Sequence, residues 1–138
     1  MKRESLIESA KLAMAQAYSP YSGYKVGAAL LCADGTIYTG CNVENASFSA
    51  TNCAERTAFF KAVSEGKREF IAMAICGGKD GEIEGIFPPC GVCRQVMREF
   101  CKDDFEIHLV TKTGVQCFTL GQLLPMSFSP ENIEKHNK

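Results

Sequence analysis

The feature that most constrains the fold is an apolar run, a turn signal and a second strand-like run in direct succession. Residues 26–32 are almost wholly apolar, Asp34 and Gly35 form the turn signal, and residues 36–43 are rich in strand-forming types. This pattern predicts a β-hairpin. Because a hairpin makes its two strands antiparallel, an all-parallel sheet is excluded and a mixed sheet is expected.

Helical and strand-like patterns alternate along the rest of the chain. Apolar residues at helical spacing predict helices over residues 5–17, 53–65 and 92–101. Short runs of β-forming residues predict strands over 70–76, 106–111 and 115–119. The Gly-rich, acidic residues 77–85 are typical of a surface loop. Helices interleaved with strands predict an α/β fold, and the absence of a linker predicts a single domain over residues 1–138.

Charge and composition narrow the classes of partner. The chain has 15 Lys and Arg against 16 Asp and Glu, a net charge of -1. Proteins that track nucleic acids are usually strongly basic, so we expect a small-molecule substrate and no nucleic acid polymer. The N-terminal residues lack the uninterrupted apolar core of a signal peptide or membrane span, so no membrane partner and a cytoplasmic location are expected. Reduced or metal-bound thiols then fit the eight cysteines better than disulfides do.

Three cysteines stand at the predicted starts of two helices. Cys53 begins the second helix, and Cys90 and Cys93 begin the third. A helix N-terminus favours the thiolate, which is the zinc-binding form, and residues three apart on a helical turn can reach one metal ion. Three protein ligands leave the fourth position of a tetrahedral zinc open, as in catalytic sites. The sequence therefore predicts one catalytic Zn²⁺ per chain.

Two charged residues follow the first of these cysteines. Glu55 is too close to Cys53 in sequence to be an expected ligand of the same ion, but it can lie beside the zinc-bound water and shuttle protons. Zinc generates hydroxide at neutral pH, and three thiolates should weaken that effect. Arg56 is expected to hydrogen-bond a ligand sulfur and offset the negative charge. Zinc nucleobase deaminases carry this signature: His or Cys, any residue, Glu, and later Pro-Cys-x-x-Cys.

From about residue 19 to residue 130 the sequence resembles the small, homotetrameric, zinc-dependent cytidine deaminases. The resemblance is carried by SPYS at 19–22, VGAAL at 26–30, GCNVENA at 40–46, CAERT at 53–57, PCGVCRQ at 89–95 and LLP at 123–125. It implies a three-layer α/β/α fold with a central mixed sheet of about five strands. It also implies a homotetramer with shared active sites.

The resemblance implies a reaction as well. Zinc-bound hydroxide would attack C4 of the cytosine ring while Glu55 protonates N3, and Glu55 would later pass a proton to the departing ammonia. Cytidine and deoxycytidine would become uridine and deoxyuridine, in pyrimidine nucleoside salvage. Asn42 and Glu44 would hold the ribose 3'-hydroxyl, the backbone N–H of Ala54 the O2 of the base, and the Cys90 carbonyl the amino group.

Four further residues match positions that surround the nucleoside in this family. Tyr24 and Phe128 match aromatic positions that pack around it, and Phe128 would come from a neighbouring subunit. Ala46 and Phe48 match a segment that reaches another subunit's site near the 5'-hydroxyl. Tyr24 stands where Phe is common and Phe48 where Tyr is common, so a hydroxyl is gained at one edge of the pocket and lost at another.

Other functions stay open at this point. A deaminase for another cytosine-containing molecule, such as blasticidin S, shares the zinc motif but not the segment with Asn42 and Glu44. A non-catalytic zinc module needs no Glu55, and nucleic acid editing lacks its basic stripe. The two histidines, His108 and His136, are far from the motifs in sequence. The remaining cysteines are expected to pack in the core: Cys32, Cys41, Cys76, Cys101 and Cys117.

Overall fold

The computed structural model describes residues 3–134, and His136 lies outside that range. Helices and strands follow one another in the order that the sequence predicts. They are α1 (Arg3–Met14), β1 (Tyr24–Cys32), β2 (Ile37–Cys41), α2 (Ala54–Ser64), β3 (Phe70–Lys79), α3 (Gly91–Phe100), β4 (Glu106–Val110), β5 (Val115–Thr119) and α4 (Leu120–Leu123), with short 3₁₀ turns at Phe48–Ala50 and Pro130–Asn132.

The five strands form one mixed sheet in the order β2-β1-β3-β4-β5. Strand β1 is antiparallel to both β2 and β3, β3 is parallel to β4, and β4 is antiparallel to β5. The predicted hairpin and the mixed sheet are therefore confirmed. Parallel strands need a crossover, and α3 with its flanking loops supplies the one between β3 and β4.

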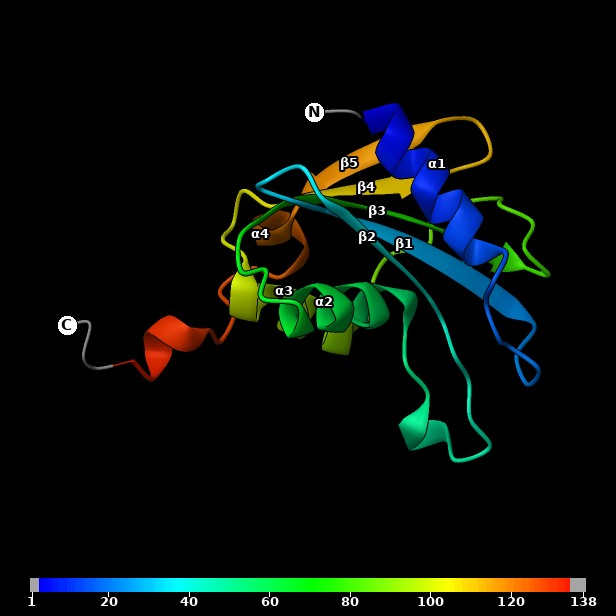
Figure 1. The fold of residues 1–138 in the computed structure, drawn as a ribbon, viewed down its shortest axis with the longest axis horizontal. Coiled ribbons are helices and arrows are strands. Elements are labelled where there is room, and N and C mark those ends of the chain that lie inside the picture. Colours follow the sequence, from blue (N-terminus) through cyan, green and yellow to red (C-terminus); the bar gives the residue numbers. More distant parts are fainter. Residues whose placement is uncertain (1–2, 135–138) are drawn as a thin grey trace.

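Helices cover both faces of the sheet, so the fold has the three expected layers (Figure 1). Helix α1 lies on one face, where Leu6 and Ala10 pack with Ala74 and Cys76. Helices α2 and α3 lie on the other face, in a second apolar cluster that includes Phe59. Alternate residues of the strands belong to alternate clusters, because successive side chains point to opposite faces of a sheet. Within residues 3–134, no helix is both long and apolar enough to span a bilayer.

Strand β3 extends further than predicted. Gly77, Gly78 and Lys79 were expected in a loop, but they pair with Val26, Lys25 and Tyr24 of β1. A Cβ on Gly78 would lie 1.9 Å from the carbonyl oxygen of Glu82, so the chain folds back tightly over this glycine. Glycine is thus needed here for close backbone approach, and the loop begins only after Lys79.

One cysteine is not where the sequence suggests. Cys32, Cys76 and Cys101 are buried as expected, and Cys41 is half-buried. Cys117 is exposed on β5, so the expectation that it packs in the core is wrong. Strand β5 is at the edge of the sheet and is covered less completely than the central strands.

Candidate metal centre and active site

The three motif cysteines meet at one point. The Sγ atoms of Cys53 and Cys90 are 3.8 Å apart, those of Cys90 and Cys93 are 3.6 Å apart, and all three lie within 4.8 Å of one another. Tetrahedral zinc with Zn–S bonds of about 2.3 Å requires sulfurs about 3.8 Å apart. The residues present therefore fit a zinc ion in both donor type and spacing. In the part of the chain that the structure describes, they are the only such group of three ligands.

Helix starts position these sulfurs. Cys53 and Cys90 are the N-cap residues of α2 and α3, with extended backbone angles, and neither side chain caps its own helix. Both thiols are therefore directed to the metal site and not to the helix N–H groups. Arg94 fixes the loop before α3, because its guanidinium donates to the carbonyls of Pro89 and Leu123 at 2.8 and 2.7 Å. The sequence motif contains Arg94, but its anchoring role could not be predicted because Leu123 is distant in sequence.

Gly40 sets the distance between α2 and the sheet. A Cβ on this residue would lie 2.4 Å from the carbonyl oxygen of Ala54 and 2.6 Å from the backbone nitrogen of Ala58. Real Cβ atoms do not approach backbone so closely, so only glycine lets the first turn of α2 rest directly on β2. That first turn carries the residues around the metal site.

A guanidinium lies against the sulfur cluster. Nη2 of Arg56 donates to Sγ of Cys53 at 3.2 Å. Hydrogen bonding from Cys93, and then from Arg56, lowers the pKa of the Cys53 thiol to about 5. The same hydrogen bond and burial raise the pKa of Cys93, because Cys93 is the donor of the pair. The cluster thus holds negative charge even before all three thiols are ionised.

Glu55 is buried next to these sulfurs. Its side chain lies in the first turn of α2, and the residue is only 4% exposed. Burial, together with the negative charge of Cys53, raises the pKa of its carboxyl to about 7. The geometry therefore keeps a buried titratable carboxyl near the metal cysteines without making it a member of the ligand set.

Asn42 and Glu44 are held by the backbone near β1. The side-chain oxygen of Asn42 accepts from the N–H of Val26, and its amide donates to the carbonyl of Tyr24, both at 2.8 Å. Glu44 accepts from the backbone N–H groups of residues 21 and 22 at 2.9 and 3.1 Å, and from the hydroxyl of Ser22. Both polar side chains are therefore fixed in the folded chain, although sequence reasoning did not identify their partners.

The aromatic residues singled out from the sequence lie at the surface. Tyr24 is exposed, stands 6.0 Å from the ring of Phe87 and has the ammonium of Lys79 at 5.2 Å. Phe48 is 76% exposed and Phe128 is 61% exposed. Ala46 and Phe48 lie on the segment between β2 and α2, which extends away from the body of the molecule, as does the tail after α4 (Figure 1). The ring of Phe48 packs edge-on against that of Tyr21, with the centroids 6.4 Å apart.

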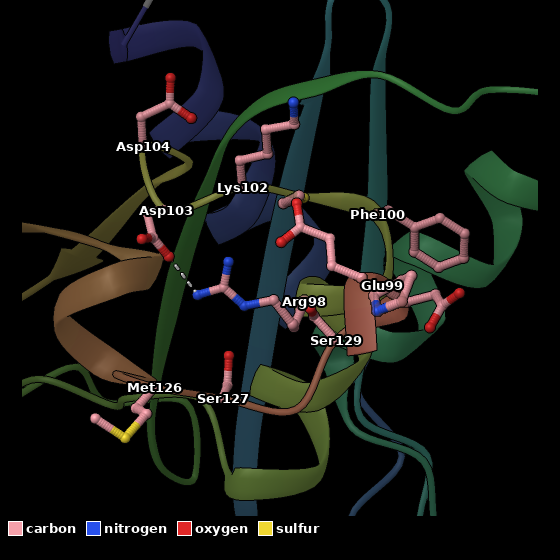
Figure 2. A pocket seen from close by; sticks show the side chains of 12 residues that line it. Arg98, Glu99, Phe100, Lys102, Asp103, Asp104, Met126, Ser127 and Ser129 are labelled. Atoms are coloured by element: carbon pink, nitrogen blue, oxygen red, sulfur yellow. Dashed lines mark hydrogen bonds and ion pairs between the residues drawn. The ribbon is translucent and has the colours of Figure 1, made fainter. Parts of the chain in front are cut away.

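Two cavities lie close to these aromatic residues in the chain, one lined by Tyr24 and one lined by the neighbours of Phe128. One, of about 630 Å³, lies beside Tyr24 and is lined by the chain from Gly77 to Phe87. The other, of about 670 Å³, lies between the end of α3 and the tail, where Arg98 points toward Asp103 and is flanked by Met126 and Ser127 (Figure 2). None of the metal cysteines lines either cavity. The sulfur cluster, and neither of these cavities, is therefore the candidate metal site.

Comparisons with known proteins agree with this geometry. Residues 1–109 match the family described as the cytidine and deoxycytidylate deaminase zinc-binding region. The chain is 51% identical over 134 residues to the cytidine deaminase of Sporosarcina psychrophila, covering 96% of each chain. It is 47% identical over 134 residues to that of Halalkalibacterium halodurans, covering 96% of this chain and 98% of the relative.

The fold agrees with a solved structure as well. The crystal structure of cytidine deaminase from Burkholderia pseudomallei is 49% identical and superposes with a TM-score of 0.86, over 93% of this chain and 100% of that one. Cys53, Cys90 and Cys93 are thus a zinc site in their chemistry, their spacing and their match to a zinc-binding family. This chain belongs to the zinc-dependent cytidine deaminases.

Proposed function

We propose that this chain hydrolyses cytidine and deoxycytidine to uridine and deoxyuridine with release of ammonia, using one Zn²⁺ per chain. The observation that carries the proposal is the buried carboxyl of Glu55 beside three converging cysteines. A structural zinc site normally has four protein ligands and no use for a buried acid, whereas a hydrolytic site needs an open position and a proton carrier. Cytidine deaminase activity follows from the family as well.

Zinc, when bound, supplies a Lewis acid that makes water nucleophilic at neutral pH. The carboxylate of Glu55 takes a proton from the attacking water and gives it to N3 of the ring as C4 is attacked. It then takes the second proton of that water, now on the C4 hydroxyl, and delivers it to the departing amino group. The charge-compensating role falls to Arg56, whose guanidinium at 3.2 Å from the Cys53 sulfur offsets part of the thiolate charge.

Backbone groups at the two helix starts are available for the base. Ala54 is the first residue of α2, where backbone N–H groups have no partner within the helix, so its N–H can donate to O2 of the base. The carbonyl of Cys90 accepts from the N–H of Arg94 at 3.0 Å, and its second lone pair can accept from the amino group. Asn42 and Glu44 bind the ribose 3'-hydroxyl through the amide N–H and the carboxylate lone pairs that their other hydrogen bonds do not use.

A homotetramer with shared active sites completes the pocket. Phe128 of one chain and the segment with Ala46 and Phe48 of another would close over the nucleoside, which packs against Tyr24 of its own chain. The projecting segments and their exposed aromatic rings support this, because large apolar side chains on a surface mark interaction sites.

The cellular setting follows from the same chemistry. We infer that residues 1–138 act as one catalytic domain in the cytoplasm, where they serve pyrimidine nucleoside salvage. All eight cysteines are free, as is usual for proteins of reducing compartments.

The test is ultraviolet-monitored turnover of cytidine and deoxycytidine by the purified protein, with zinc counted per chain. Glu55→Gln keeps the size and hydrogen-bonding shape of the side chain but cannot carry the proton, so it should bind zinc normally and lose turnover by about 10²- to 10⁴-fold. Glu84→Gln, an exposed carboxylate in a loop, is the matched control.

Other outcomes would redirect the assignment. Zinc at one per chain without turnover of either nucleoside would refute the substrate and favour a blasticidin-type deaminase. Full function in Glu55→Gln would favour a non-catalytic zinc module. Turnover of single-stranded nucleic acid in place of the free nucleosides would refute the choice of a small substrate.

A further inference from the structure

A second group of reactive side chains lies on the opposite face of the sheet from the metal cysteines. Cys117 of β5 is the direct partner of His108 in β4, and Glu106 is two residues before His108 on the same strand. Residues with this register and spacing point to one face. Val110, next in the series, packs in the cluster with α1, whereas the metal cysteines start the helices on the other face.

These three side chains form a hydrogen-bonded relay. Sγ of Cys117 is 3.0 Å from Nδ1 of His108, and Nε2 of His108 is 3.0 Å from a carboxylate oxygen of Glu106. The imidazole is only 2% exposed, whereas Cys117 and the carboxylate of Glu106 reach solvent. A buried ring therefore connects an accessible thiol to an accessible acid.

The carboxylate decides which ring nitrogen carries the proton. An ionised Glu106 can only accept, so Nε2 of His108 is the protonated nitrogen and Nδ1 is free to accept from the thiol of Cys117. The two nitrogens face different partners, so the group does not converge as metal ligands would. A nucleophile, a base and a group that orients the base are instead the arrangement of an activated thiol.

We propose that Cys117, activated by His108 and Glu106, is a modification site that forms mixed disulfides with low-molecular-weight disulfides. Nδ1 of His108 takes the thiol proton, and the thiolate of Cys117 attacks one sulfur of the small disulfide. The S–S bond of the reagent breaks as the new S–S bond forms, and the leaving thiolate takes the proton from the imidazolium. Cys117 is thereby oxidised and half of the reagent is reduced to a thiol.

The other cysteines are poor competitors for this reaction. Burial raises the pKa of Cys76 to about 11 and that of Cys101 to about 12, and it also raises the pKa of Cys32. Cys53, Cys90 and Cys93 belong to the zinc site. All eight cysteines lie in the described part of the chain; outside the zinc site Cys41 is half-buried, and only Cys117 is exposed.

The experiment follows the uptake of oxidised glutathione by the zinc-loaded protein at pH 6, using intact-mass and peptide mass spectrometry. An ordinary thiol is only about 0.3% ionised at this pH. In this protein Nδ1 of His108 lies 3.0 Å from the sulfur and can take the thiol proton, and His108→Gln removes that base. We expect one adduct per chain, on Cys117, formed at least about tenfold faster than in His108→Gln.

Three further variants make the result decisive. Cys117→Ser should form no adduct and keep full deaminase turnover, so this proposal can fail without the proposed function failing. Glu106→Gln removes a half-exposed charge and should slow the adduct severalfold even if His108→Gln does not fold. Glu84→Gln removes a carboxylate that pairs with Lys112, in the turn between β4 and β5, and it should not slow adduct formation. Equal rates in the wild type and Glu106→Gln, or an adduct on other cysteines, would overturn the proposal.

Discussion

The contact between Gly40 and helix α2 provides the sharpest test of how the fold positions the zinc site. In Gly40→Ala, the new methyl carbon would lie 2.4 Å from the carbonyl oxygen of Ala54 and 2.6 Å from the nitrogen of Ala58. Ordinary contacts of this kind lie near 3.5 Å, so the start of α2 must retreat by about 1 Å. The obstructing atoms are backbone, so no side-chain rotation can relieve the clash.

Two quantities should change together. Overpacking of this kind costs about 1–3 kcal/mol of folding free energy, which urea denaturation can measure. A misplacement of about 1 Å at a catalytic group can cost about 100-fold in rate, and the moving turn carries both Cys53 and Glu55. We therefore expect lower kcat and weaker zinc retention in Gly40→Ala, measured by ultraviolet-monitored turnover and by metal analysis after dialysis.

A matched substitution separates this effect from a general effect of replacing glycine. A Cβ on Gly85 would meet no atom within 4 Å, so Gly85→Ala should leave stability, zinc content and turnover close to those of the unmodified protein. If Gly40→Ala were as stable and as active as Gly85→Ala, the close contact with β2 would not fix the position of α2.

Three other perturbations test the site. Arg56→Gln removes one hydrogen bond to a charged group, so it should lower kcat by about 10- to 100-fold while the urea midpoint changes little. A fall in stability as large, in free energy, as the loss of kcat would contradict a charge-compensating role. Asn42→Ala leaves the N–H of Val26 and the carbonyl of Tyr24 unpaired, so it should cost about 1–3 kcal/mol of stability and raise KM for cytidine; unchanged KM would argue against ribose binding. Removal of zinc with a chelator should abolish turnover and lower the melting temperature, because a metal that binds only the folded state stabilises it; a stripped sample that remains active would exclude a zinc mechanism.

The metal cysteines could be predicted because short sequence segments identify them. Cys90 and Cys93 lie one helical turn apart, and Cys53 stands at another helix start, so residue type and spacing were enough to predict one shared metal. The structure confirms that their sulfurs converge. The predicted strands and helices were also found, since each depends on apolar periodicity within a short window.

Features that depend on distant partners could not be predicted in this way. Gly77 and Gly78 favour a loop by local propensity, but pairing with β1 keeps them in a strand. The hydrogen bonds from Ser22 to Glu44 join residues 22 positions apart and have no periodic signature. The exposure of Cys117 follows from its place on an edge strand, which only the strand order reveals.

If Asn42 binds the ribose as proposed, its hydrogen bonds also limit how the sugar selectivity of this protein can be altered. This side chain joins the start of β1 to the end of β2 before any nucleoside is present. Its orientation is therefore achieved during folding, and binding need not supply the entropy to order it. Directed evolution toward nucleosides with other sugars should accordingly succeed more often at the exposed Tyr24 and Phe48 than at Asn42, where each new side chain must also replace a structural bridge.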